Sequence, residues 1–250
     1  MFFTIRIYIY AGILVVGSIF NLQKAKKRFH QSNNQVVMEE IFTTPQRVSQ
    51  KVIQRTGTTV QVNGREKLLD EPVLYVANHQ GLFDILAFLG YLGRPIGFIA
   101  KKEIKKLPII RSWMELLYCV FIDRKDRRQS MKAIQQGIEN LKAGHSLVIF
   151  PEGTRSRGSK IGEFKSGSLR LAMKANVPIV PVAIDGTYHM LEEKGRVQAS
   201  DITMIISDPI YPIDYQSLKN AELAQRIQHT VEQLLDGCNN KELKKADITK

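Results

Sequence analysis

Cysteine is scarce in this sequence, and the histidines are scattered. Only Cys119 and Cys238 occur among the 250 residues, which is too few for a disulfide framework and fits a reduced compartment. The histidines outside position 79 lack the spacing of a zinc site; they are His30, His145, His189 and His229. No metal is therefore expected. The chain also has no internal repeats and no low-complexity tracts.

Negative charge is in short supply as well. The formal net charge is +12, although the hydrophobic share of 44% and the charged share of 24% are ordinary for a globular domain. Such a composition can build a sizeable core in one domain with a small appendage. The excess of positive charge predicts anionic partners: phospholipid surfaces, phosphorylated substrates, acidic carrier proteins or nucleic acid.

Near the start of the chain, Ile7 to Leu22 carries no charge but is short for a membrane span. As a helix it would be about 24 Å long, against a hydrocarbon core of roughly 30 Å. Only Arg6 precedes it and no Ala-x-Ala site follows, so a cleaved secretion signal is not expected. A short spanning helix, a half-inserted hairpin and a core helix all remain open. The basic cluster that follows suits an anionic cytoplasmic lipid surface: Lys24, Lys26, Lys27 and Arg28.

The most informative stretch is Asn78 to Asp84. It follows an apolar run, Val73 to Ala77, that predicts a buried strand, and it precedes an apolar segment that predicts a helix. Polar side chains placed this way lie at the carboxyl edge of a sheet, where open α/β folds have their sites. His79 can accept a proton near neutral pH, and Asp84 can fold back onto one ring nitrogen and fix its tautomer. No serine or cysteine nucleophile is obvious beside them, which favours activation of a substrate hydroxyl. A hydrogen-bonded turn histidine and a Cys119–His79 pair are the alternatives.

A second polar stretch, Phe150 to Ser156, also follows a predicted strand, Ser146 to Ile149. Gly153 permits unusual backbone angles, and Arg155 has a guanidinium suited to phosphate. Because both stretches follow core strands, they can meet at one edge of the sheet and form a site.

These residues resemble the signature blocks of the glycerolipid acyltransferase family, most closely its bacterial branch that acylates 1-acylglycerol-3-phosphate. Four blocks occur in the family's order between Val73 and Ile184. They are Asn78-His79 with Asp84, then Val120 to Arg124, then Phe150 to Ser156, and then Val177 to Val182. One departure is Tyr118, where the second block often begins with glycine. A bulky ring there is expected to reshape the glycerophosphate pocket.

The resemblance implies an α/β fold with a mixed β-sheet flanked by helices, and an N-terminal helical element that associates with the membrane. It implies transfer of a fatty acyl group from a thioester to the sn-2 hydroxyl of a lysophosphatidic acid, which gives phosphatidic acid. His79 would be the base and Asp84 its partner. Substrate-binding roles would fall to Lys101, by the family's Ala-Lys-x-Glu pattern, and to Arg124, Glu152, Gly153, Thr154 and Arg155.

The resemblance also sets the expected partners and location. No bound cofactor is expected, since acyl-coenzyme A or acyl-carrier protein would be the donor substrate. The enzyme is expected at the cell membrane, in contact with membrane lipids, with its catalytic domain on the cytoplasmic side and without nucleic acid. Two alternatives remain: acylation of glycerol-3-phosphate or another lysolipid, and a non-catalytic basic protein that binds membrane or nucleic acid.

The expected organisation is a membrane-associating helical segment (1–55), an acyltransferase domain (56–238) and a charged tail (239–250). Pro45 interrupts the apolar pattern of Gln35 to Arg55, so that stretch predicts two short helices. A closing amphipathic helix is predicted to end at Gly237.

Overall fold

A seven-stranded mixed sheet forms the centre of the computed structural model, which describes residues 1–32 and 34–248, with side chains through Gly237. The strands lie in the order β1-β7-β6-β2-β5-β3-β4. Their bounds are β1 (Thr59–Asn63), β2 (Leu74–Ala77), β3 (Gly97–Lys101), β4 (Val120–Ile122), β5 (Leu147–Ile149), β6 (Ile179–Asp185) and β7 (Asp201–Ile206). Strands β2 and β5 lie where the apolar runs Val73 to Ala77 and Ser146 to Ile149 predict them, and the mixed α/β fold class is confirmed.

Strand direction gathers the polar loops at one edge. The strands β6, β2, β5, β3 and β4 run parallel, whereas β7 pairs antiparallel with β6 and parallel with β1. The five parallel strands therefore share a carboxyl edge, and their following loops leave from it. Both candidate stretches, after β2 and after β5, lie at this edge.

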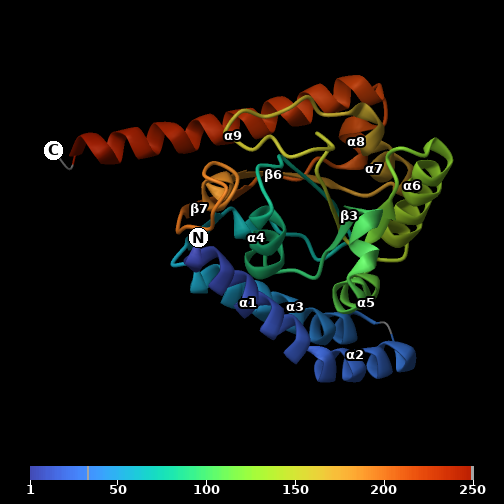
Figure 1. Ribbon diagram of the computed structural model, residues 1–250. Coiled ribbons are helices and arrows are strands. Elements are labelled where there is room, and N and C mark those ends of the chain that lie inside the picture. Colours follow the sequence, from blue (N-terminus) through green and yellow to red (C-terminus); the bar gives the residue numbers. More distant parts are fainter. Residues whose placement is uncertain (33, 249–250) are drawn as a thin grey trace.

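Helices cover both faces of the sheet (Figure 1). They are α1 (Phe2–Gly17), α2 (Ile19–Gln31), α3 (Gln35–Arg55), α4 (Phe83–Tyr91), α5 (Pro108–Leu116), α6 (Arg127–Lys142), α7 (Arg170–Ala175), α8 (Pro212–Tyr215) and α9 (Asn220–Ile248). Short 3-10 turns are η1 (Arg65–Lys67), η2 (Lys102–Lys106), η3 (Ser166–Leu169) and η4 (Thr187–Met190). Helices α1 to α5 pack on one face, and α6 to α9 pack on the other.

Strand β2 shows why the sheet is buried on both sides. Tyr75 and Ala77 belong to the cluster with α1 to α5, whereas Leu74 and Val76 belong to the cluster with α6 to α9. Successive side chains of a strand point to opposite faces, so a strand covered on both sides is a continuous apolar run. This burial fixes the strand from which the His79 turn leaves.

The prediction of two helices between Gln35 and Arg55 is wrong, because α3 is continuous through Pro45. A proline inside a helix costs about 3 kcal/mol. The buried side of α3 nevertheless runs past it on both sides, from Met38 to Ile53, and packs closely against α4. A fully buried aliphatic or aromatic side chain contributes about 1.5–3 kcal/mol, so the packing outweighs the cost of the proline.

The N-terminal apolar segment is bent rather than a single element. Helices α1 and α2 meet at Ser18 at an angle of 42°. The Ser18 hydroxyl donates to the Val15 carbonyl at 2.6 Å and accepts from Trp113 Nε1 at 2.9 Å, and such back-bonding by serine bends helices. Among the described residues, each helix alone is too short or too polar to cross a bilayer, while the bent α1–α2 pair passes on length and composition.

At the other end of the chain, the closing helix does not stop at Gly237 but continues to Ile248. The side chains of the predicted charged tail (239–250) lie outside the described residues. The first predicted boundary, at residue 55, falls where α3 ends and before β1 begins; the division into domains stays a prediction.

The turn after β6 generates a stability prediction. Gly186 has a φ of +89°, and a Cβ built on it would lie 2.0 Å from the Asp201 carbonyl oxygen. Gly186→Ala should therefore lower the free energy of unfolding by at least about 2 kcal/mol, through backbone strain and overlap together. Chemical denaturation in detergent measures the loss.

Gly195→Ala is the matched control. Gly195 also has a positive φ, +62°, but a Cβ there would meet no atom within 4 Å. It should cost only about 1 kcal/mol, the cost of an unfavourable backbone conformation. Equal losses in the two variants would contradict the close contact at Gly186.

Candidate active site

His79 and Asp84 form the predicted pair. His79 leaves the end of β2, and Asp84 lies in the first turn of α4. The distance from His79 Nδ1 to Asp84 Oδ2 is 2.6 Å, with the Asp84 side chain fully buried and that of His79 17% exposed. A carboxylate on Nδ1 holds a proton there and leaves Nε2 as the nitrogen that can accept one.

Asp84 has two further donors. The backbone N–H of Gly81 donates to Oδ2 at 2.9 Å, and the Thr187 hydroxyl donates to Oδ1. A buried carboxylate is costly unless hydrogen bonds satisfy it. These contacts therefore hold the carboxylate in place against Nδ1 of the imidazole.

The turn that carries His79 is also anchored to β6. The Asn78 amide donates to the Ile184 carbonyl at 2.8 Å and accepts from the Ile184 N–H at 2.9 Å. Gln80 Nε2 donates to Asp185 Oδ1 at 2.7 Å. The residues on either side of His79 thus fix its backbone to the neighbouring strand.

The loop after β5 runs beside His79. Glu152 Oε1 accepts from the His79 N–H at 2.6 Å, and the Ser156 N–H donates to the His79 carbonyl at 2.8 Å. Glu152 Oε2 accepts from the Gly162 N–H at 2.8 Å. Burial raises the pKa of Glu152, while these two amides oppose that rise. Glu152 therefore shapes the site by holding backbone, and its oxygens are occupied by protein donors.

The imidazole has an aromatic neighbour from the same loop. The ring of Phe150 stacks on that of His79 with centroids 4.2 Å apart and planes 16° from parallel. Phe150 is itself buried against Phe88 and Phe98. Stacking fixes the plane of the imidazole, and Asp84 fixes its rotation within that plane.

Arg155 forms an ion pair with Glu192. Its Nη1 lies 3.2 Å from Glu192 Oε1, which also accepts from the Leu82 N–H at 2.8 Å. The Glu192 side chain is only 5% exposed, and that of Arg155 is 41% exposed. One carboxylate thus links the second candidate stretch to the turn of the first.

The other predicted residues occupy the same sheet edge with fewer contacts. Lys101 ends β3, and Thr154 is exposed next to Gly153. Arg124 follows β4, and desolvation lowers the pKa of its guanidinium. The neighbouring Lys102 pairs with Asp123, and that hydrogen bond raises the pKa of Lys102 and lowers the pKa of Asp123.

Three residues near the site were not predicted: Thr187, Glu192 and Lys165. Thr187 contacts Asp84, Glu192 contacts Arg155, and the ammonium of Lys165 approaches Gly153. All three lie outside the four blocks, and only the tertiary structure brings them into contact with the residues of the site. The only signal in the sequence was position, since Thr187 and Glu192 follow the strand β6.

The arrangement combines a histidine base with cationic side chains at the carboxyl edge of an α/β sheet. Among the described residues, no three His, Cys, Asp or Glu side chains are grouped to hold a metal ion. Such a site can remove a proton from a hydroxyl while cations hold an anionic part of the same molecule. Fold and site define an α/β protein with a histidine–aspartate pair suited to activating the hydroxyl of an anionic molecule.

Comparison with known proteins identifies the family. The Acyltransferase family model matches residues 59–185. A probable 1-acyl-sn-glycerol-3-phosphate acyltransferase of Mycoplasma pneumoniae is 35% identical over 190 residues, 71% of each chain. The yeast Saccharomyces cerevisiae has a 1-acyl-sn-glycerol-3-phosphate acyltransferase that is 33% identical over 69% of this chain and 58% of its own. This chain belongs to the acyltransferase family.

A solved structure is similar over nearly the whole chain. The crystal structure of the 1-acyl-sn-glycerophosphate acyltransferase PlsC from Thermotoga maritima has a TM-score of 0.83 and 28% identity, and the match covers 95% of both chains. The similarity therefore includes the N-terminal helices as well as the sheet.

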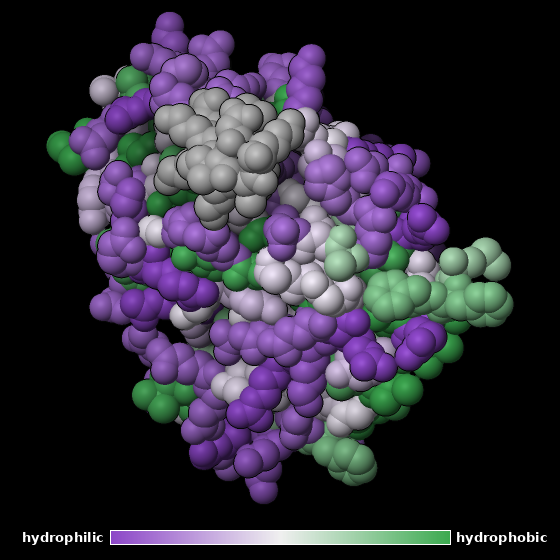
Figure 2. Space-filling model, turned by 90° about the vertical axis from the view of Figure 1, so that its left-hand side faces the viewer, coloured by the Kyte–Doolittle hydropathy of each residue, from purple (hydrophilic) through white to green (hydrophobic). Residues whose placement is uncertain are grey.

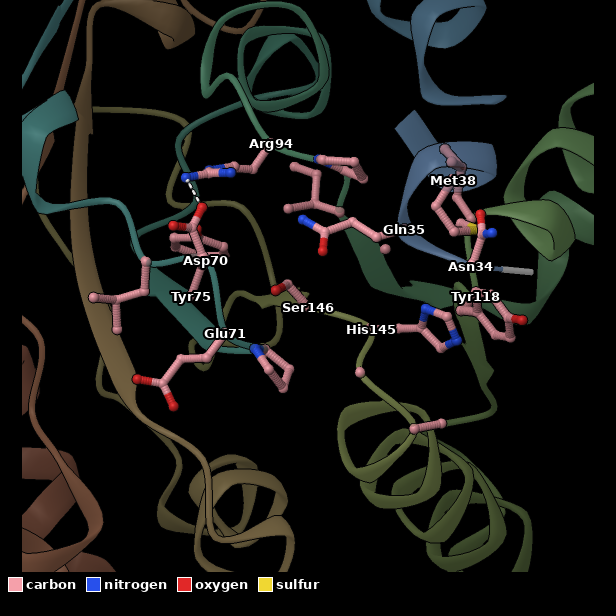
Figure 3. Close-up of a pocket in the computed structure, with 18 residues that line it drawn as sticks. Asn34, Gln35, Met38, Asp70, Glu71, Tyr75, Arg94, Tyr118, His145 and Ser146 are labelled. Carbon is pink, nitrogen blue, oxygen red and sulfur yellow. Dashed lines mark hydrogen bonds and ion pairs between the residues drawn. The ribbon is translucent and has the colours of Figure 1, made fainter. Parts of the chain in front are cut away.

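A separate pocket of about 350 Å³ lies at the amino edge of the parallel strands, opposite His79 (Figure 3). Its lining includes Arg94 paired with Asp70, and Tyr118 stacked on His145 with centroids 3.4 Å apart. Tyr118 has a φ of +55°, which glycine adopts without strain. The expectation that its ring reshapes the glycerophosphate pocket is wrong, because Tyr118 precedes β4 and lies at this opposite edge.

Cys119 lies at the same amino edge. It directly precedes β4, and its sulfur accepts from the Phe98 N–H at 3.2 Å. Burial raises the pKa of its thiol to about 12. A nucleophilic Cys119–His79 pair is therefore excluded, because the thiol stays protonated and the two residues lie at opposite edges.

The amino-edge pocket generates a pH prediction. Burial lowers the pKa of His145 below its usual 6.5, so the folded state favours the neutral ring. The stability that this residue contributes is present above pH 6.5 and is lost as pH falls through the lower pKa of the folded state. In His145→Phe, which keeps a ring against Tyr118, stability should fall less between about pH 7 and pH 5 than in wild type.

Urea denaturation at several pH values measures this difference. Because the other titrating groups are common to both proteins, the gap between the two curves isolates His145. A gap that stays constant with pH would contradict burial of a neutral ring.

Proposed function

We propose that this chain transfers a fatty acyl group from an acyl thioester to the sn-2 hydroxyl of 1-acyl-sn-glycerol 3-phosphate and so forms phosphatidic acid. The observation that carries the proposal is the 2.6 Å contact between His79 Nδ1 and buried Asp84 at the carboxyl edge of the sheet. The relatives named for this reaction supply the identity of the substrate.

His79 acts as the general base. Its Nε2 takes the proton of the sn-2 hydroxyl while the oxygen attacks the thioester carbonyl. The new ester C–O bond forms and the C–S bond breaks. The leaving thiolate takes the proton from His79 and departs as the free thiol. Asp84 holds the ring and stabilises its charged form during the transfer.

The phosphate of the acceptor is on the sn-3 carbon of glycerol, which is bonded to the sn-2 carbon that carries the reacting hydroxyl. Cations that bind this phosphate must therefore lie close to the base. Arg155 is held beside the His79 turn through Glu192, whose Oε1 accepts a hydrogen bond from Nη1 of the guanidinium. The remaining N–H groups can meet a phosphate oxygen pair. Lys101 and Arg124 leave the same edge and add positive charge.

The acyl donor is acyl-coenzyme A or acyl-carrier protein, and it is a substrate rather than a bound cofactor. Both carriers are acidic, which suits a chain with a net charge of +12.

Membrane attachment through α1 completes the proposal, with the catalytic domain on the cytoplasmic side. One side of α1 and of the start of α2 exposes large apolar residues at helical spacing: Phe2, Ile5, Ile9, Ile13, Val16 and Phe20. Figure 2 shows apolar residues gathered on one side of the molecule. The basic residues of α2 follow, Lys24 to Arg28, and each contributes about 1 kcal/mol near an anionic leaflet.

The first test of the proposal is acyl transfer by wild type and His79→Ala. Acyl-coenzyme A or acyl-carrier protein serves as donor, and lysophosphatidic acid or glycerol 3-phosphate as acceptor, in detergent. We expect product from lysophosphatidic acid with wild type and a loss of about a hundredfold or more in kcat with the variant.

His229→Ala is the control, because His229 is an exposed histidine of α9. It should keep wild-type activity. Equal product from wild type and His79→Ala would refute the histidine mechanism, and activity only toward glycerol 3-phosphate would refute the acceptor.

The second test concerns the membrane. Ile9→Asp with Ile13→Asp places two charges on the exposed apolar side of α1, where these side chains are 58% and 63% exposed. We expect binding to vesicles with anionic lipid to weaken at least about tenfold, since two apolar anchors are lost. Vesicle sedimentation measures it.

Met131→Asp is the matched control. Met131 is 66% exposed, but it lies on α6, which packs on the opposite face of the sheet. It should leave vesicle binding unchanged. Equal binding by the α1 variant and wild type would place the membrane contact elsewhere.

A further inference from the structure

Two cations converge beside Gly153. A Cβ built on this glycine would lie 3.1 Å from Lys165 Nζ and 3.5 Å from Arg124 Nη1. Arg124 follows β4, Gly153 follows β5, and Lys165 directly precedes η3. The loop after β4 and the two ends of the connection between β5 and η3 thus bring two positive charges to one point at the carboxyl edge of the sheet.

Among the described residues, neither cation has a carboxylate partner. The ion pairs among the described residues include Lys102 with Asp123 and Arg155 with Glu192, but none with Arg124 or Lys165. Since both distances are measured to one point, the two nitrogens lie within about 7 Å of each other, where like charges repel. An anion between them would relieve this repulsion.

Gly153 leaves room for that anion. Its φ of +73° is a conformation that other residues rarely adopt, and any side chain would project into the space between the two cations. Its neighbours also hold it beside the base, since Glu152 and Ser156 both hydrogen-bond the backbone of His79. The space therefore lies close to the reacting hydroxyl.

We propose that Lys165, together with Arg124, binds the phosphate of the acceptor lipid. This inference rests on the proposed function and adds to it a residue outside the four signature blocks. The acceptor carries its phosphate on the carbon adjacent to the one with the free hydroxyl, so its anion must lie near His79. Arg155 shares its charge with Glu192, whereas Lys165 and Arg124 have no acidic partner among the described residues, so their full charge is available to the phosphate.

The test compares an acceptor with phosphate, lysophosphatidic acid, with one that lacks it, a monoacylglycerol. Lys165→Met keeps the length of the side chain and removes the charge. We expect its KM for lysophosphatidic acid to rise about tenfold or more, the usual effect of one lost charged hydrogen bond. The kcat should change little, and activity toward monoacylglycerol should stay at the wild-type level. Lys165→Arg should restore most of the affinity.

Lys160→Met is the control, because Lys160 is an exposed lysine five residues earlier in the same loop. Melting temperatures of all variants establish that they fold. An unchanged KM for lysophosphatidic acid in Lys165→Met would overturn the proposal. A raised KM for the acyl donor alone would also overturn it, because that result would show that the two cations bind phosphate groups of the donor.

The same assay separates this inference from the function on which it rests. Wild type that fails to acylate lysophosphatidic acid would refute the proposed function. Wild type that is active, with Lys165→Met equally active at low acceptor concentration, would refute only the role of Lys165.

Discussion

The site depends on one fully buried carboxylate. Asp84 has no exposed side-chain surface, and an isolated charge in such a place would be strongly unfavourable. Its donors are His79, the backbone N–H of Gly81 and the hydroxyl of Thr187. They come from the turn after β2 and from the segment after β6, so satisfying this one group fixes the distance between the two segments. The orientation of the imidazole follows from that constraint.

Two other buried carboxylates organise the loops around this pair. Glu152 accepts from the backbone of His79 and Gly162, and Glu192 accepts from the backbone of Leu82 and from Arg155. In each case a carboxylate from one loop takes an N–H from another. Buried carboxylates therefore hold the loops of the site together, while exposed cationic side chains of the same loops can bind an anionic substrate.

One of these carboxylates, that of Glu192, also lowers the stability of the fold. Glu192 Oε2 is buried and has no hydrogen-bond partner among the described residues, and such an oxygen is unfavourable for folding. A Cβ on Gly81 would lie 2.4 Å from the same oxygen, so any larger residue in the turn would have to displace the Glu192 carboxylate. Sites often keep such locally unfavourable groups where function needs a fixed geometry.

Much of the fold could be predicted because the sheet is buried on both faces. Strands β2 and β5 are fully buried apolar runs, and polar stretches follow them. His79 and Asp84 come after β2, and Glu152 and Arg155 come after β5. The continuity of α3 through Pro45 could not be predicted, since tertiary packing against α4 decides it. The same applies to the side-chain contacts of the site.

Contacts between distant segments were the harder part of the site. Asp84 contacts Thr187, which is 103 residues further along the chain. Arg155 contacts Glu192, which is 37 residues further along. Lys165 lies in a polar loop whose composition resembles many solvated loops. Its place beside Gly153 appears only when β4, β5 and η3 come together.

The most direct test of the central claim is the tautomer of His79, measured by nitrogen NMR of histidine-labelled protein in detergent. We predict that the neutral ring in wild type carries its proton on Nδ1, toward Asp84, and leaves Nε2 bare. In Asp84→Asn, whose amide can donate to Nδ1, the tautomer with the proton on Nε2 should become populated. A wild-type ring with its proton on Nε2 would contradict the claim that Asp84 prepares the base.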